Sequence, residues 1–251
     1  MTAAPVAIVT GAAGGIGAAT SIRLARDGMH VVVADARLDV AEDVAARLRH
    51  EGHDAVALAV DVGQADSVAE AVAAILARWG RIDVLVNNAG VESAKAFLDI
   101  ALDEFERVMR VNSTGAWLCC QAVVPVMRRQ CSGAIVNVSS VAAQRGGGFL
   151  GTAAYATSKG AVIALTKALA REFATEGIRV NAVAPAFTLT NFVRRQLESK
   201  PAGTMDRILA ATPIGRAAEP GEIAAVIAFL GSANASFVTG HVYNVDGGAA
   251  M

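Results

Sequence analysis

Tyr155 and Lys159 stand four residues apart in the small-residue segment GTAAYATSKGAVIALTKALA. In a helix, side chains at i and i+4 share one face, with Cβ atoms about 5–6 Å apart. A free tyrosine titrates near pH 10 and is a poor base at neutral pH. An ammonium about 6 Å from the phenol, at an effective dielectric constant of about 20, favours the phenolate by about 2.8 kcal/mol, or about two pKa units. The spacing therefore predicts a phenol tuned for acid–base catalysis. A solvated lysine beside a half-buried tyrosine is the alternative.

Glycines that could hold a phosphate follow the first strand-like segment, in AIVTGAAGGIGAATSIRLARDG. Gly11, Gly15 and Gly17 allow a tight turn, a close approach to a pyrophosphate and the use of a helix N-terminus as its binding site. Gly14 and Ile16 complete the loop, and we expect all five residues to contact the ligand. The segment predicts nucleotide binding, although a tight turn alone also needs glycine.

Asp35 follows the second strand-like segment, 18 residues beyond Gly17. A carboxylate there accepts hydrogen bonds from both hydroxyls of an adenosine ribose and repels a 2′-phosphate. Gly14 brings no basic side chain to this place, whereas Arg37 could reach a phosphate. The pattern favours NAD, with NADP as the alternative.

The helices and strands that position these residues can be predicted from the periodicity of apolar residues along the chain. Short apolar, β-branched segments alternate with amphipathic helical ones, which predicts one doubly wound sheet covered by helices on both faces. The expected strands are 6–9, 31–34, 55–60, 83–86, 134–138, 178–183 and 241–245. We therefore expect a single domain over residues 1–251, with a seven-stranded, mainly parallel sheet.

Residues 187–219 form a long segment between a strand and a helix, which predicts a small lid lobe over a site. Two helix starts are also indicated. Asp103–Glu106 has the form of a capping box, with Asp in place of Ser or Thr. Pro220 is placed as a first-turn proline.

Composition excludes several function classes. The 251 residues carry a formal net charge of −1 and no run of more than two Lys or Arg, so we expect no nucleic-acid partner. No apolar run reaches the length of about 18 residues of a membrane span, and the N-terminus does not resemble a signal peptide. The 3 cysteines are too few for a disulfide framework, and the 4 histidines have no ligand spacing, so we expect a cytoplasmic protein without a catalytic metal.

Four motifs occur in one order: TGAAGGIG, NNAG (87–90), VNVSS (136–140) and YATSK (155–159). Together they resemble the short-chain dehydrogenase/reductase family, and the resemblance extends through NAVAPAFTLT to VTGHVYNVDGG. It implies a Rossmann-type fold, a nicotinamide cofactor and a homotetramer. By position, Tyr155 is similar to the catalytic acid/base of the family, and Lys159 to its partner. Ser140 is similar to the hydroxyl that orients the carbonyl, with Ser139 as the open alternative. Asn112 is similar to the asparagine that holds a proton-relay water.

The same resemblance implies further cofactor contacts. They are Asn88, Ala89 and Gly90 along the adenosine, Asp61 and Val62 at the adenine, Pro185, Thr188 and Thr190 at the nicotinamide, and Tyr155 and Lys159 at its ribose. Two residues depart from the family pattern, because Ala186 stands where Gly is usual and Thr188 where Ile or Val is usual.

The predicted reaction is hydride transfer between NAD and a secondary alcohol or ketone. An NADPH-dependent 3-oxoacyl thioester (acyl-carrier-protein) reductase is the alternative. A non-catalytic NAD-sensing regulator is a remote one, because such proteins commonly lose the Tyr or Lys that this chain keeps. Apolar residues in segments expected to border the site are Phe149, Leu150, Phe187, Leu189, Phe192 and Val193.

Overall fold

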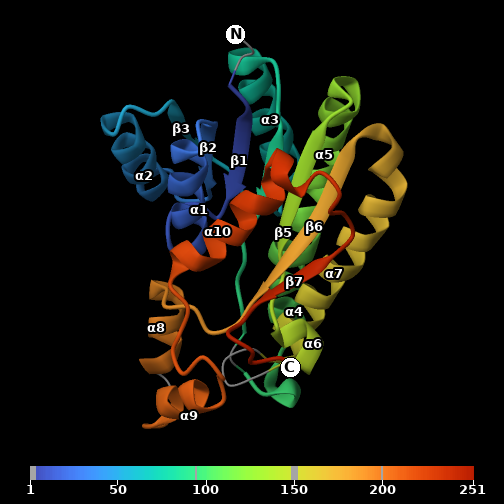
Figure 1. Cartoon of the computed structure of the whole chain (residues 1–251). Coiled ribbons are helices and arrows are strands. Elements are labelled where there is room, and N and C mark those ends of the chain that lie inside the picture. The colour runs from blue at the N-terminus through green and yellow to red at the C-terminus, as the bar shows by residue number, and fades with distance from the viewer. Residues whose placement is uncertain (1–3, 94, 148–151, 199) are drawn as a thin grey trace.

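The computed structural model describes residues 4–93, 95–147, 152–198 and 200–251 (Figure 1). Seven strands form one parallel sheet in the order β3-β2-β1-β4-β5-β6-β7. They are β1 Val6–Thr10, β2 His30–Asp35, β3 Ala55–Ala59, β4 Val84–Asn87, β5 Gly133–Val138, β6 Ile178–Pro185 and β7 Val242–Val245. The predicted doubly wound sheet is confirmed, and every pairing in it is parallel.

Helices cover both faces of the sheet. They are α1 Gly15–Arg26, α2 Leu38–His50, α3 Ala65–Trp79, α4 Leu102–Met109, the π-helical turn η2 Arg110–Thr114, α5 Gly115–Gln130, α6 Ala142–Arg145, α7 Ala153–Phe173, α8 Asn191–Glu198, α9 Thr204–Ala210 and α10 Pro220–Gly231. Short 3₁₀ turns are η1 Phe97–Asp99, η3 Ala174–Glu176 and η4 Ala233–Ala235.

The two faces bury separate apolar clusters. Ala7 and Val9 of β1 face the cluster that contains the buried residues of α1, α2 and α10, whereas Val6 and Ile8 face the cluster of α3, α5 and α7. Successive strand side chains alternate between the two faces, so a strand covered on both sides must be apolar at every position. All five residues of β1 are buried, which explains why the strand segments read as continuous apolar runs.

The strand order reverses at β1, which pairs with β2 on one side and with β4 on the other. In such sheets ligands bind beyond the carboxyl ends of the strands at this reversal point. The glycine loop follows β1, Asp35 ends β2, and the NNAG motif begins at Asn87, the last residue of β4. The topology therefore gathers the three motifs at one edge.

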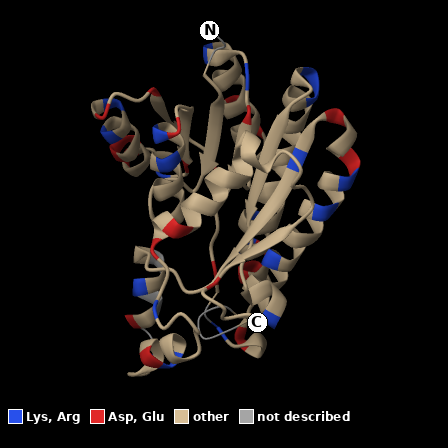
Figure 2. Cartoon of the chain, in the orientation of Figure 1, with Lys and Arg blue, Asp and Glu red and all other residues tan. Residues whose placement is uncertain are grey.

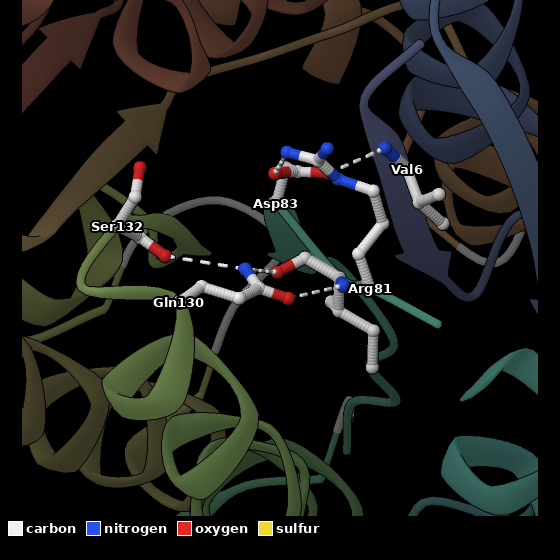
Figure 3. Close-up of polar contacts among 6 residues, drawn as sticks. Val6, Arg81, Asp83, Gln130 and Ser132 are labelled. Carbon is white, nitrogen blue, oxygen red and sulfur yellow. Dashed lines mark hydrogen bonds and ion pairs between the residues drawn. The ribbon is translucent and has the colours of Figure 1, made fainter. Parts of the chain in front are cut away.

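The opposite, amino-terminal edge is held by polar contacts (Figure 3). Asp83 Oδ2 accepts hydrogen bonds from Val6 N and Arg81 Nε, both at 2.8 Å, and Arg81 Nη2 donates to Asp83 Oδ1 at 2.7 Å. Gln130 accepts from Ile82 N at 2.9 Å and donates to Ile82 O at 2.8 Å. These bonds join β1, the segment before β4 and the end of α5, so the register of the central strands is set far from the glycine loop.

Residues 187–219 contain α8 and α9, which lie together beyond the carboxyl ends of the strands (Figure 1). Leu189 N donates to Ala218 O at 2.8 Å and Ala218 N to Phe187 O at 3.0 Å, so the two ends of the segment meet. This arrangement is a small lobe joined to the sheet by a narrow base, as the length of the segment predicts.

One predicted helix start is wrong and one is confirmed. Helix α4 begins at Leu102 and has Ala101 as its N-cap with no side-chain cap, because Asp103 already lies inside the first turn. Pro220 does stand in the first turn of α10, and Glu219 N donates to Glu222 Oε2 at 2.9 Å. Acidic residues near a helix start can therefore serve the helix dipole without forming a capping box.

Charged residues of both signs are interspersed over the helices, and the strands carry very few (Figure 2). Among the described helices, none combines the length and the apolar character that a membrane crossing needs. The described residues also contain no group of three or more His, Cys, Asp or Glu side chains suited to hold a metal ion.

Candidate active site

Tyr155 and Lys159 both lie near the start of α7, with Lys159 Nζ 5.8 Å from the centre of the tyrosine ring. Lys159 is only 3% exposed, and its Nζ donates a hydrogen bond to Val138 O at 2.7 Å. The carbonyl is the last of β5, so the ammonium is fixed at the carboxyl edge of the sheet. Ala156, a small residue between the two, is buried as well.

The pKa values of these two groups differ from the prediction. Burial raises the pKa of Tyr155 to about 12, and the group that lowers it is the Ser140 hydroxyl. Burial also lowers the pKa of Lys159 to about 8. On titration Lys159 thus loses its proton before the phenol does, and a neutral amine gives the phenolate no Coulombic stabilisation. The expected lowering of the pKa of Tyr155 by Lys159 is therefore not found among the protein groups around the phenol, and the positive charge of an oxidised nicotinamide is the other contribution that the sequence predicts.

The two neighbouring serines face different partners. Ser139 is 2% exposed, and its Oγ donates to Lys159 O at 2.9 Å, so it ties the end of β5 to helix α7. Ser140 Oγ accepts a hydrogen bond from Ala142 N at 3.1 Å and interacts with the Tyr155 phenol. The geometry therefore favours Ser140 over Ser139 as the hydroxyl beside the reacting oxygen.

Asn112 lies in the π-helical turn η2 between α4 and α5 and is 2% exposed. Its Oδ1 accepts from Val91 N at 2.8 Å, and its Nδ2 donates to Val91 O at 2.8 Å and to Ser158 Oγ at 2.9 Å. A π turn changes the hydrogen-bond pattern of the helix and occurs often at functional sites. The turn thus holds the loop after β4 against the helix that carries Tyr155.

Ser158 belongs to this site but is absent from the residues predicted from the sequence. It is fully buried, and its Oγ donates to Tyr155 O at 2.8 Å while accepting from Asn112. Ser113 Oγ donates to Ser158 O at 3.0 Å. The position of Ser158 between Tyr155 and Lys159 in the sequence could have indicated a role in the site. Its partner Asn112 could not be predicted, because it lies in a distant part of the chain.

The NNAG motif meets both the glycine loop and Lys159. Asn88 Nδ2 donates to Thr10 O and to Gly11 O, both at 2.9 Å. A Cβ on Gly17 would stand 2.3 Å from Gly11 O and 2.6 Å from Asn88 Nδ2, so only glycine fits there. At the other end of the motif, the place of a Cβ on Gly90 lies 3.4 Å from Lys159 Nζ. The motif therefore connects the two halves of the site.

Thr10, also absent from the predicted set, completes this connection. Its Oγ1 accepts hydrogen bonds from Asn88 N and Ala89 N, both at 3.1 Å, and donates to Val86 O at 3.3 Å. Strand-end threonines are common, which is why the sequence did not single it out. Its three bonds fix the NNAG turn at the reversal point of the sheet.

Asp35 is 8% exposed at the end of β2 and faces the glycine loop. Its Oδ2 accepts from Ala13 N at 3.0 Å, and its Oδ1 accepts from Arg37 N at 3.1 Å. Arg37 Nε lies 3.5 Å from the same Oδ1, so the guanidinium pairs with the carboxylate. Carboxylate oxygens have further lone pairs, so both can still accept a ribose hydroxyl.

Asp61 and Val62 follow β3 and fill structural positions. Asp61 Oδ1 accepts from Gly63 N at 2.9 Å, and Val62 is buried with its Cγ2 only 2.6 Å from the place of a Cβ on Gly115. Gly14 is exposed with no atom within 4 Å of the place of a Cβ, whereas Ile16 packs on the core cluster of α1, α2 and α10. These contacts account for the loop shape, and Gly14 leaves the space beside it open.

The loop after β6 lies against the glycine loop. Gly15 has φ +55°, and the place of its Cβ is 3.0 Å from Thr190 Cγ2, so any other residue there would be strained and would crowd Thr190. Thr190 Oγ1 accepts from Val193 N at 3.2 Å at the start of α8, and Thr188 Oγ1 donates to Ala186 O at 3.2 Å. Pro185 ends β6. Pro185, Thr188 and Thr190 thus border the same edge as Asp35 and Lys159.

The expected substrate-side residues are only partly described. Phe149 and Leu150 and the side chain of Phe192 lie outside the described residues. Leu189 lines an open cavity of about 550 Å³ between the lobe and the start of α10, together with Met205, Leu209, Arg216, Ala217, Glu219 and Glu222.

Glu92, absent from the predicted set, follows the NNAG turn, and burial raises its pKa to about 7.

Comparison with known proteins agrees with this arrangement. A family model described as Enoyl-(Acyl carrier protein) reductase matches residues 11–250. The 3-oxoacyl-[acyl-carrier-protein] reductase of Synechocystis sp. is 42% identical over 99% of this chain and 98% of its own length. The cis-4-hydroxycyclohexanecarboxylate dehydrogenase of Sinomonas cyclohexanicum is 43% identical over 97% of this chain and 95% of its own length. The crystal structure of gox2181 superposes with a TM-score of 0.94 at 37% identity, over 98% of this chain and 95% of that one. By its fold, its site geometry and these matches, the chain belongs to the short-chain dehydrogenase/reductase family of oxidoreductases.

Proposed function

We propose that this oxidoreductase transfers a hydride between NAD and a secondary alcohol or ketone, with Tyr155 as the general acid/base. The observation that carries the proposal is the meeting of Tyr155, Ser140 and Lys159 beside the glycine loop at the reversal point of the sheet. A proton carrier, a hydroxyl donor and a buried cation next to a nucleotide-binding edge are the groups that carbonyl reduction requires.

The residues of the chain fit a nicotinamide dinucleotide. Gly14 leaves open space at the loop, the start of α1 offers backbone N–H groups to a pyrophosphate, and Asp35 has lone pairs for ribose hydroxyls. When bound, the cofactor supplies or accepts the hydride and, when oxidised, brings a positive charge. We assign the nicotinamide side to Pro185, Thr188 and Thr190 and the adenosine side to Asp61, Val62, Asn88, Ala89 and Gly90.

In this mechanism, each side chain has one task. Ser140 hydrogen-bonds the substrate oxygen and holds it beside the phenol. Tyr155 gives its proton to that oxygen in reduction and removes the proton in oxidation. Lys159 holds ribose hydroxyls and, protonated below about pH 8, adds positive charge beside the reacting oxygen. Asn112 keeps the loop after β4 in register with α7 and, through a water at the π turn, links Lys159 to solvent.

NAD is the proposed cofactor rather than NADP. The buried Asp35 stands where a 2′-phosphate of NADP is expected, and a carboxylate repels such a phosphate. Arg37, a side chain suited to attract it, is paired with Asp35. The balance of charge therefore favours a ribose with a free 2′-hydroxyl.

Reduction of a 3-oxoacyl thioester is the second candidate. It is favoured by the names of several relatives, among them the Synechocystis protein and the 3-oxoacyl-[acyl-carrier-protein] reductase FabG of Thermotoga maritima, which is 38% identical over 97% of this chain. It requires the site to accept a long carrier arm. Both candidates use the same proton carrier, so the substrate separates them.

The test is the absorbance change of reduced nicotinamide with a panel of secondary alcohols, ketones and acetoacetyl thioesters, with NAD(H) and NADP(H) in parallel. We expect turnover with NAD(H) and an alcohol–ketone pair, and loss of turnover with intact NADH binding in Tyr155→Phe. Turnover retained in that variant would remove Tyr155 from its proposed role. Activity confined to the thioesters would favour the second candidate.

We also propose that the chain forms a homotetramer in the cytoplasm. Large apolar side chains are exposed at Phe97, Leu98 and Leu102 around the start of α4, and Phe237 is fully exposed near β7. Apolar surface of this kind is typical of subunit contacts. The cysteines are free thiols, as a reducing compartment favours. Light scattering measures the mass directly, and four copies are expected.

A further inference from the structure

The short helix α6 follows Ser140 and depends on it. Ala142 N donates a hydrogen bond to Ser140 Oγ at 3.1 Å, and Ala143 N donates to Ser140 O at 3.0 Å. The helix has only 4 residues and ends at Gly146, which has φ +74°. A single turn gains little from its own hydrogen bonds, because forming the first turn of a helix fixes several residues for one bond. The position of α6, and of the Ser140 hydroxyl at its start, must therefore be set by contacts with other elements.

Gln144 on α6 and Asn244 on β7 form a reciprocal pair of side-chain amides. Gln144 Nε2 donates to Asn244 Oδ1 at 2.8 Å, and Asn244 Nδ2 donates to Gln144 Oε1 at 3.1 Å, between residues 100 positions apart in the chain. Each amide uses its oxygen and one N–H group, so the two bonds restrain orientation as well as distance. Asn244 pairs with Ala184 of β6, so the amide pair anchors α6 to the sheet.

A second contact joins α6 to the C-terminal tail, the residues that follow β7. Arg145 Nη1 donates to Ala249 O at 3.0 Å, and α6 lies beside the C-terminus (Figure 1). The tail forms a turn around a carboxylate, because Asp246 Oδ1 accepts from Gly248 N at 3.0 Å and its Oδ2 from Ala250 N at 2.9 Å. The partner of Arg145 is therefore part of an ordered turn.

The far side of the tail is held by the end of the lobe. Ile214 N donates to Gly247 O at 3.1 Å, and the place of a Cβ on Gly247 lies 2.8 Å from Ile214 Cγ2. Chain termini are poorly ordered unless such contacts hold them. The tail thus gives α6 a second anchor, independent of the sheet.

We propose that Gln144 is a positioning residue for the reaction, whose amide pair with Asn244 fixes α6 so that the Ser140 hydroxyl faces the substrate oxygen. The inference rests on the proposed function, which gives Ser140 its task. Arg145 restrains the same helix through the tail. The amide pair is exposed, and neutral hydrogen bonds of this kind add only about 1 kcal/mol to stability, so its loss should leave the protein folded.

The experiment measures kcat and KM with whichever substrate pair the panel above yields. Gln144→Ala is made in the wild-type enzyme and in Ser140→Ala. The control is Gln121→Ala, which truncates an exposed glutamine on α5. The melting temperature and the Kd for NADH of each variant verify that the protein is folded and the cofactor site intact.

We expect Gln144→Ala to lower kcat about tenfold in the wild-type enzyme, near the value of one net hydrogen bond, with KM within about twofold. In Ser140→Ala the same change should lower kcat by less than about twofold, because the hydroxyl that it positions is gone. A merely structural role would lower kcat by the same factor in both backgrounds. The control should keep the kcat of wild type.

An exchanged pair provides a second measurement that does not need turnover by Ser140→Ala. Gln144→Asn combined with Asn244→Gln keeps two amides of the same combined length and should restore kcat to within about threefold of wild type, whereas Gln144→Asn alone should not. Unchanged kcat in Gln144→Ala, an equal loss in both backgrounds, or no recovery in the exchanged pair would overturn the inference and leave the proposed function standing. No turnover of any substrate by wild type would count against both.

Discussion

Lys159 Nζ lies 5.8 Å from the ring centre of Tyr155, yet it is bonded to Val138 O and buried as deeply as a core residue. Burial penalises the charge of each group, so the pKa of the lysine falls to about 8 while that of the tyrosine rises to about 12. Protonated tyrosine at neutral pH suits donation to a ketone. We therefore expect reduction to prevail near pH 7 and oxidation to speed up as the pH rises toward 10, measured as initial rates in both directions.

The buried Lys159 should cost the enzyme stability. Its pKa is lowered from 10.5 to about 8, so the folded state disfavours the ammonium. This cost is complete below pH 8, fades as the pH rises from 8 to 10.5, and is on the order of 3 kcal/mol. Lys159→Met should raise the melting temperature at pH 7 by several degrees, reduced by the loss of the hydrogen bond to Val138. The same substitution should abolish turnover. A variant less stable than wild type at pH 7, or an equal difference at pH 7 and pH 10, would contradict the shifted pKa.

Ser158 should act as a positioning residue, because its hydroxyl bonds both the Asn112 side chain and the backbone of Tyr155. Ser158→Ala removes the link but leaves Asn112 bonded to Val91. We expect kcat to fall about tenfold, near the value of one buried hydrogen bond, with KM nearly constant. The exposed neighbour Thr157→Ala is the matched control. If the role is only structural, the melting temperature will fall while kcat and its pH profile stay as in wild type.

Asp35 should decide the choice between NAD and NADP. Asp35→Asn keeps an acceptor for Ala13 N but removes the charge and frees Arg37 from its ion pair. We expect the ratio of kcat/KM for NAD to that for NADP to fall at least tenfold, since phosphate repulsion is lost. Asp39→Asn, an exposed change on α2, should leave the ratio as it is. An unchanged ratio in Asp35→Asn would show that selectivity resides elsewhere.

Asp83 should matter for stability and not for cofactor binding, because its bonds to Val6 and Arg81 lie at the amino-terminal edge of the sheet (Figure 3). Asp83→Ala leaves the first strand N–H without its acceptor, at a cost of about 1–3 kcal/mol. The midpoint of urea unfolding should fall accordingly, while the Kd for NADH stays within about twofold. Weakened NADH binding in a fully folded variant would show that the two edges are coupled.

The order of strands and helices could be predicted from the sequence, because a strand covered on both faces must be apolar throughout and helices show a 3.6-residue period. All seven strands lie within two residues of the predicted ends. The helix start at Asp103–Glu106 could not be predicted, since the same acidic residues suit a cap and a first turn equally well.

The sequence by itself determined that the motifs lie at one edge of a parallel sheet. Each motif directly follows a strand, and a strand can be recognised from the local sequence. Only the tertiary structure decided how Ser139 and Ser140 divide their partners and how Ser158 meets Asn112 across 46 residues. The tertiary structure also decided the pKa values of Tyr155 and Lys159. Burial and contacts between distant segments depend on how the helices pack on the sheet, and spacing along one helix does not encode them.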